Sequence, residues 1–281
     1  TYIMLFAVVV NAVLDPILIF GYAGFPALGL KGAAIATAIS RGLTMVLSIY
    51  VLIRRERLIT FDVPTQAVLS GCWRAILNIA LPSGLARLVV PIATAVITAM
   101  LSGYGESAVA AFGVGSRIEF LASSLIFALA ASIGPFVGQN IGKGELSRVN
   151  QAVKISNRFA IVWGLFSWAL LAVFATPIAT IFNKNQEVIE AVVLFLWTVP
   201  AGFGLQGVLS VINSNLNTIN KPMQASLIIA VQMLVVGLPL IFIGKSMFEV
   251  KGIFAGLALT YIIGGLMSLI VNKRVMREYR I

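Results

Sequence analysis

The sequence has 281 residues, of which 59% are hydrophobic and only 11% are charged, and its mean hydropathy is +1.01. Soluble domains carry about 25% charged residues, so these values exclude a soluble fold and indicate an all-α polytopic membrane protein. The net charge of +10 comes mostly from the ends of apolar segments, which favours membrane orientation over nucleic-acid binding. Because there is one cysteine and no histidine, no disulfide, metal site, cofactor or enzyme activity is predicted.

Eight apolar segments are each long enough to cross a membrane, for which about 20 residues are needed. In chain order they cover residues 3–21, 32–53, 75–102, 107–140, 155–182, 187–213, 223–244 and 252–272. The fourth is long for a single span, so we expect it to tilt or to begin outside the hydrocarbon. The longest polar connection, 54–74, is expected to link two helical bundles and to end in a short amphipathic helix at the membrane interface.

The first segment carries unusual polar residues in the stretch NAVLDPILIFG. Asn11 and Asp15 are four residues apart, which places them on one face of a helix. Pro16 has no N–H group, so it leaves the carbonyl oxygen of Ala12 free beside these side chains. An acid at membrane depth costs roughly 2.5–3.5 kcal/mol and is a functional-site hypothesis by default. These oxygens suit H⁺ or a small hard cation such as Na⁺. The alternative is a capped helix end with a solvated aspartate.

The distribution of Lys and Arg predicts the orientation of the chain. If the segments alternate in direction, 13 basic residues lie on one side of the membrane and four on the other. The positive-inside rule places the richer side, which includes the carboxyl terminus, in the cytoplasm. Asp15 then lies in the outer half of the membrane.

Two opposite charges, Arg87 and Glu119, are expected at similar depth near the membrane midplane, on neighbouring helices. Such a pair either only stabilises its helix bundle or also presents unused hydrogen-bonding groups to a substrate cavity. The sequence leaves both interpretations open. Gln206, Asn213 and Gln232 are three further polar residues within apolar segments, and such residues serve as interhelical hydrogen-bond partners more often than as ligands.

An internal repeat relates the first two segments to the last two. Each copy has a proline, an apolar run ending in glycine, a short loop, a Lys-Gly dipeptide and a basic end. Lys31-Gly32 matches Lys251-Gly252, at an offset of 220 residues, and both copies run in the same direction. If the last two segments complete a six-helix lobe, the first two should complete an equivalent lobe whose other four helices are missing. A true eight-helix protein is the alternative.

The sequence resembles the MATE (multidrug and toxic compound extrusion) family, and in particular its DinF-like branch. The resemblance rests on NAVLDPILIFG, ALPSGLARL, AAFGVGSRIEF, ASIGPFVGQNIGKGE and LNTINKP, and it covers all eight segments. It implies a twelve-helix protein with two six-helix lobes, lacking here the first four helices. Residues 1–54 would be the last two helices of the amino-terminal lobe, 55–74 a cytoplasmic linker, and 75–281 the complete carboxyl-terminal lobe with a short cytoplasmic tail.

The resemblance implies an antiporter, coupled to H⁺ or Na⁺, that exports cationic or amphipathic compounds by alternating access. The family's cation site would map to Asn11 and Asp15, with Thr37 on the next helix. The full-length protein would be a monomer among the lipids of the plasma membrane, with no cofactor and no nucleic-acid partner. Two alternatives are a lipid-linked oligosaccharide flippase, for which Arg41, Arg87 and Arg117 are the available cavity arginines, and a non-transporting truncated subunit.

Overall fold

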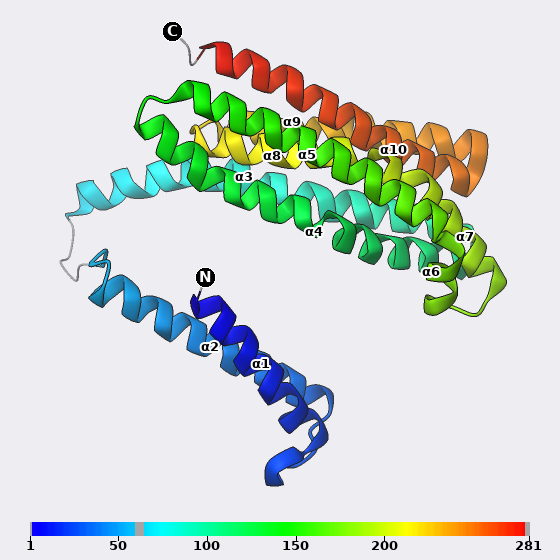
Figure 1. The fold of residues 1–281 in the computed structure, drawn as a ribbon, viewed down its shortest axis with the longest axis horizontal. Helices are drawn as coiled ribbons and strands as arrows, with labels where there is room; N and C mark the ends of the chain where they lie inside the picture. The colour runs from blue at the N-terminus through cyan, green and yellow to red at the C-terminus, as the bar shows by residue number, and fades with distance from the viewer. Residues whose placement is uncertain (1, 60–64, 279–281) are drawn as a thin grey trace. The chain divides into compact units, whose positions relative to one another are not determined.

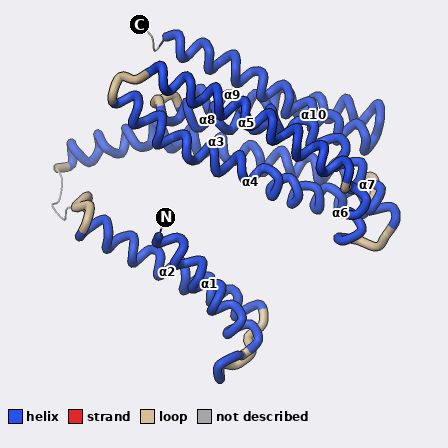
Figure 2. Tube along the Cα trace, in the orientation of Figure 1, coloured by secondary structure: helices blue, strands red, loops and turns tan. Residues whose placement is uncertain are grey.

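The computed structural model describes residues 2–59 and 65–278, and all regular elements in these ranges are helices (Figure 1, Figure 2). Six helical stretches of the described residues are long and apolar enough to cross a membrane. One of them, 222–278, contains two of the eight segments expected from the sequence, and 88–102 is a shorter apolar stretch. The predicted fold class, an all-α multi-pass membrane protein, is therefore confirmed.

The chain separates into two compact units, residues 1–70 and 71–281. The first contains α1 (Tyr2–Phe20), the short 3₁₀ turn η1 (Tyr22–Gly24) and α2 (Leu30–Arg54). These two helices form a hairpin, because the backbone N–H of Leu28 bonds the carbonyl of Leu18 at 3.0 Å. A side chain at Gly32 would collide with that same carbonyl group. Glycine therefore allows the two helix backbones to approach.

The second unit is a bundle in which several long helices contain breaks. Its elements are α3 (Gln66–Ser102), α4 (Glu106–Gly142), α5 (Leu146–Val173), α6 (Ala175–Phe182), α7 (Gln186–Thr198), η2 (Val199–Gly202), α8 (Phe203–Thr218), α9 (Pro222–Ala230), η3 (Val231–Gly237) and α10 (Leu238–Glu278). The η2 turn is 3₁₀-helical and η3 is π-helical. Aromatic side chains join the helices in the core, where the ring of Phe195 lies 6.3 Å from that of Phe112 and 5.2 Å from that of Phe254.

The helix α10 is two antiparallel helices joined by a sharp reversal. Phe248 and Glu249 have non-helical backbone angles, and Glu249 has a φ of 51°. The two arms meet closely, because a side chain at Gly252 would collide with the backbone of Gly244. Gly252 and Gly32 are matching positions of the predicted repeat. Each lies at the start of the second helix of a hairpin, against the backbone of the first helix. This close approach explains why glycine occurs at both positions of the repeat.

The structure differs from the expected segments at two places. The connection 54–74 was expected to end in a short interfacial helix, but from Gln66 onward it is part of α3, which continues to Ser102 without a break. The segment expected at 155–182 is divided at Phe174, where α5 ends and α6 begins. The pattern of apolar residues continues from α5 into α6, so hydropathy alone does not locate the break at Phe174. The predicted linker falls partly on residues 60–64, which lie outside the described residues.

Candidate functional site

Asn11 and Asp15 lie on one face of α1, as their spacing predicts. The Nδ2 group of Asn11 donates a hydrogen bond to Oδ1 of Asp15 at 3.4 Å, and both side chains are half-buried. This distance is long for a hydrogen bond, so the carboxylate keeps most of its capacity to bind other groups. Pro16 follows directly and lies inside the helix, where it cannot donate to the carbonyl of Ala12.

A groove of about 220 Å³ lies between α1 and α2 and brings together residues that are distant in the sequence. It is lined by Ala7, Val8, Asn11, Thr37, Ser40, Arg41 and Thr44. The structure therefore places Thr37 in the same groove as Asn11, although no spacing in the sequence relates the two. The Thr37 hydroxyl donates to the carbonyl of Ala33 at 2.9 Å, so its oxygen remains an acceptor toward the groove. Asp15 does not line the groove and is linked to it through Asn11.

Glu119 lies on α4 and is half-buried. It lines a cavity of about 240 Å³ formed by residues of α3, α4, η3 and α10. Its hydrogen-bond partner there is the hydroxyl group of Tyr261, a buried residue of α10. The expected partner, Arg87, lies within α3, but its side chain is outside the described part of the chain. The Arg87–Glu119 pair thus stays a prediction, and Tyr261 is a partner that the sequence did not reveal.

Gln206 has a partner on a neighbouring helix. The Nε2 group of Gln232 donates to its Oε1 atom at 2.7 Å and lies 3.3 Å from the carbonyl oxygen of Thr260. Gln232 is only 1% exposed and belongs to the π-helical turn η3. A side chain at Gly264 would collide with Gln232, so a glycine makes room for this network. The structure thus favours an interhelical role for Gln206 over contact with a substrate.

Removing both partners of this network should cost less than the sum of the two single removals. We expect Gln232→Leu to lower the free energy of unfolding by about 1–2 kcal/mol, because Oε1 of Gln206 then loses its donor. The double variant Gln206→Leu/Gln232→Leu should be more stable than the sum of the two single losses predicts. Thermal unfolding in detergent measures both, with the exposed Gln151→Leu as the control. Strictly additive losses would contradict the proposed pairing.

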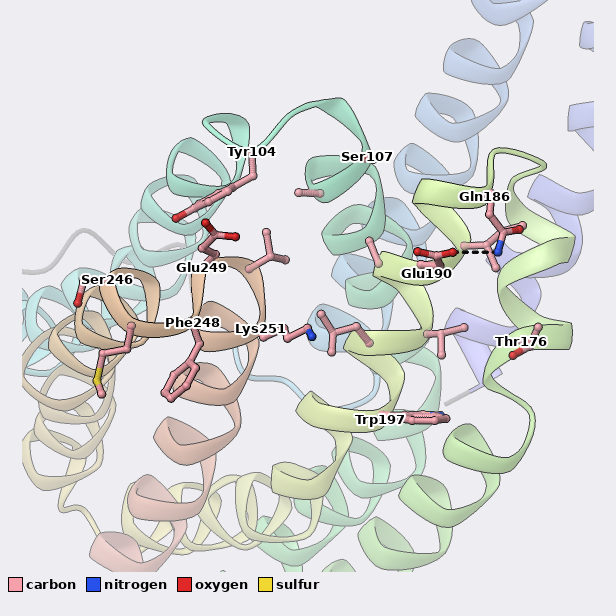
Figure 3. A pocket seen from close by; sticks show the side chains of 17 residues that line it. Tyr104, Ser107, Thr176, Gln186, Glu190, Trp197, Ser246, Phe248, Glu249 and Lys251 are labelled. Atoms are coloured by element: carbon pink, nitrogen blue, oxygen red, sulfur yellow. Dashed lines mark hydrogen bonds between the residues drawn. The ribbon is translucent and has the colours of Figure 1, made fainter.

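A larger pocket, of about 910 Å³, opens at one end of the second unit (Figure 3). Its 17 lining residues come from the α3–α4 junction, α6, α7 and the reversal in α10. Figure 3 shows Tyr104 beside Glu249 at one side of the pocket, and Glu190 beside Gln186 at the other. The Gln186 Nε2 group donates to Glu190 at 3.1 Å. Lys251 also lines the pocket, which therefore contains charged groups of both signs.

Comparison with known proteins identifies relatives that are transporters. The MatE family model matches residues 82–243. A FAD transporter of Shewanella oneidensis is 35% identical over 276 residues, which cover 97% of this chain and 60% of that protein. A multidrug export protein MepA of Staphylococcus saprophyticus is 24% identical over 95% of this chain and 58% of its own length. The chain thus spans about three fifths of the length of these two relatives.

Solved structures give the same fold. The crystal structure of the Vibrio cholerae MATE transporter VcmN in the bent form has a TM-score of 0.86 and 29% identity, covering 99% of this chain and 62% of that one. An outward-facing multidrug resistance MATE family transporter also has a TM-score of 0.86, at 21% identity, with coverage of 99% and 62%. The second likeness concerns the fold alone.

Proposed function

Because this chain belongs to the MATE family of membrane transporters, we propose that it is part of a cation-coupled antiporter that exports amphipathic organic compounds by alternating access. The coupling ion is H⁺ or Na⁺, and Asp15 is the residue that binds it. Asn11 and Thr37 contribute further oxygen atoms near it.

The observation that carries this proposal is the pair of Asn11 and Asp15 in α1. In the described part of α1, which is otherwise apolar, Asp15 is the one charged residue. An acid in a membrane-spanning helix lowers stability, so its presence calls for a function that needs its charge. A cation bound by the carboxylate neutralises that charge. Pro16 weakens the helix at the same level, so that binding can be accompanied by a bend.

We propose that the carboxyl terminus and residues 54–74 face the cytoplasm, following the distribution of basic residues. Asp15 then lies five residues from the outer end of α1, roughly 8 Å along the axis, where a cation arriving from outside can reach it. The one cysteine, Cys72, is exposed. Labelling with a membrane-impermeant maleimide, applied from one side at a time, tests this orientation.

Two substrate classes are candidates. Cationic or amphipathic drugs are suggested by two relatives, one named as a probable multidrug resistance protein and one as a multidrug export protein, which are 26% and 24% identical to this chain. A flavin dinucleotide is suggested by the FAD transporter, which is 35% identical over nearly the whole chain. The higher identity favours the second class as a substrate to be tested beside the first.

Flux measurements in proteoliposomes test this function. The protein should be expressed from its complete reading frame and reconstituted with either ethidium or FAD as the transported compound. We expect a gradient of H⁺ or Na⁺ to drive movement of at least one compound against the direction of the cation. An ionophore that collapses the gradient should abolish this movement. Flux that is independent of both gradients, or no flux at all, would contradict the proposal and favour a non-transporting subunit.

A further inference from the structure

Arg41 is a charged residue in the middle of an apolar helix. It lies 11 residues after Leu30 and 13 before Arg54, which places it roughly 17 and 20 Å from the two ends of α2. No other charged residue occurs between Lys31 and Arg54. An arginine side chain can reach the interface only from near a helix end. Arg41 is too far from both ends, so its charge needs a partner within the membrane.

The described residues of the first unit do not provide that partner. Within its described residues, 2–59 and 65–70, the ion pair is Arg55–Glu56, which is exposed. The guanidinium group of Arg41 is exposed to the groove between α1 and α2 and forms no hydrogen bond with these residues. Within the first unit, its five N–H donors are therefore unused.

The other groups in the groove leave Arg41 as its main hydrogen-bond donor. The hydroxyl groups of Ser40 and Thr44 donate to backbone carbonyls of α2, at 2.9 and 2.8 Å, as that of Thr37 does. Their hydrogen atoms are thus already used. The remaining donors are the guanidinium group of Arg41 and the second amide hydrogen of Asn11, so donors concentrate at Arg41.

The size of the groove limits what it can hold. Its volume of about 220 Å³ is below the roughly 300–1,000 Å³ of pockets that enclose a whole drug-sized ligand. It can hold one group of a larger molecule. A planar guanidinium binds phosphate through two parallel hydrogen bonds, so phosphate is the anionic group that Arg41 suits best.

We propose that Arg41, assisted by Asn11, binds the phosphate group of the exported compound. This inference rests on the proposed transport function, and it narrows the substrate class to amphipathic compounds that carry a phosphate ester or pyrophosphate. The rest of the molecule would extend out of the groove. A phosphorylated lipid has the same group, so the experiment must distinguish it from a soluble substrate.

Two flavins form a matched pair of probes. FAD carries a pyrophosphate, whereas riboflavin has the same ring system and no phosphate. Binding to protein from the complete reading frame is measured by flavin fluorescence in maltoside detergent, which contains no phosphate. We expect Arg41→Gln to weaken FAD binding about tenfold, equivalent to ~1.4 kcal/mol, and to leave riboflavin binding unchanged. Arg41→Lys should weaken it less, because it keeps the charge but not the two parallel bonds.

Arg54→Gln is the control, because it removes the same charge from the end of the same helix and does not line the groove. It should leave the binding of both flavins unchanged. Equal weakening of FAD and riboflavin by Arg41→Gln would overturn the proposal and indicate a structural role. Binding of short-chain phosphatidylglycerol that depends on Arg41, together with FAD binding that does not, would assign the group to a lipid and also overturn it.

A further measurement decides the case in which neither flavin binds. Inorganic pyrophosphate should then raise the unfolding temperature of the unmodified protein more than that of Arg41→Gln, since a ligand stabilises the state that binds it. An equal increase in the unfolding temperature of both proteins would overturn the phosphate subsite. Binding does not require coupling, so Arg41-dependent binding without ion-driven flux would contradict the antiporter and leave the subsite standing.

Discussion

Asp15→Asn should abolish ion-driven export while the protein still accumulates in the membrane. Asparagine has nearly the same shape as aspartate but no charge, so α1 should pack unchanged and lose its affinity for the coupling ion. The variant should therefore show flux at the level of protein-free liposomes under an imposed H⁺ or Na⁺ gradient. The measurement is flux in proteoliposomes per mole of reconstituted protein, with membrane expression determined in parallel.

Glu56→Gln is the matched control for this experiment. It removes one carboxylate from the same unit, at an exposed position beside Arg55, where surface ion pairs contribute little. Its flux should equal that of the unmodified protein. Normal ion-driven export by Asp15→Asn would show that the coupling site lies elsewhere. A loss of flux that merely follows a loss of folded protein would point to a structural role for Asp15.

Gly164→Val should prevent the second unit from packing correctly. A Cβ atom at Gly164 would overlap the backbone of Gly204, because α5 and α8 are in direct contact there. A backbone cannot rotate away as a side chain can, so the two helices would have to separate. We expect a cost at or above the upper end of the roughly 1–3 kcal/mol typical of overpacked cores. Thermal unfolding in detergent and the monodisperse fraction on size-exclusion chromatography measure it.

Gly113→Ala is the control for this effect. Gly113 is an exposed residue of α4, and a Cβ atom there would meet no other atom within 4 Å. Alanine also favours a helix over glycine by roughly 0.5–1 kcal/mol. This variant should unfold at the same temperature as the unmodified protein or at a higher one. Equal behaviour of the Gly164 and Gly113 variants would show that the α5–α8 contact does not determine stability.

The helical fold followed from the sequence because the membrane restricts the possibilities. A long apolar segment has no water to satisfy its backbone groups, so it forms a helix whatever its neighbours are. The pairing of Asn11 with Asp15 was also predictable, since residues four apart on a helix lie on one face. Both inferences depend on local geometry alone.

Contacts between helices could not be predicted in this way. Nothing in the spacing of Gln206 and Gln232 indicated that they bond each other, and Tyr261 gave no signal as a partner of Glu119. The reversal at Glu249 was expected only as a short loop between two segments. These features depend on how helix faces meet, and many apolar faces are nearly equivalent in sequence.

The sequence by itself determined that this protein is a helical membrane protein and that Asp15 is its most unusual acid. It did so because the costs of a buried charge and of an unpaired backbone are set by the membrane and not by the fold. Only the tertiary structure decided what surrounds Asn11, the hydrogen-bond partner of that acid. The packing of α1 against α2, made possible by Gly32, places Thr37 and Arg41 in one groove with Asn11. Such a groove exists only where two helices meet, so no residue pattern within either helix could specify it.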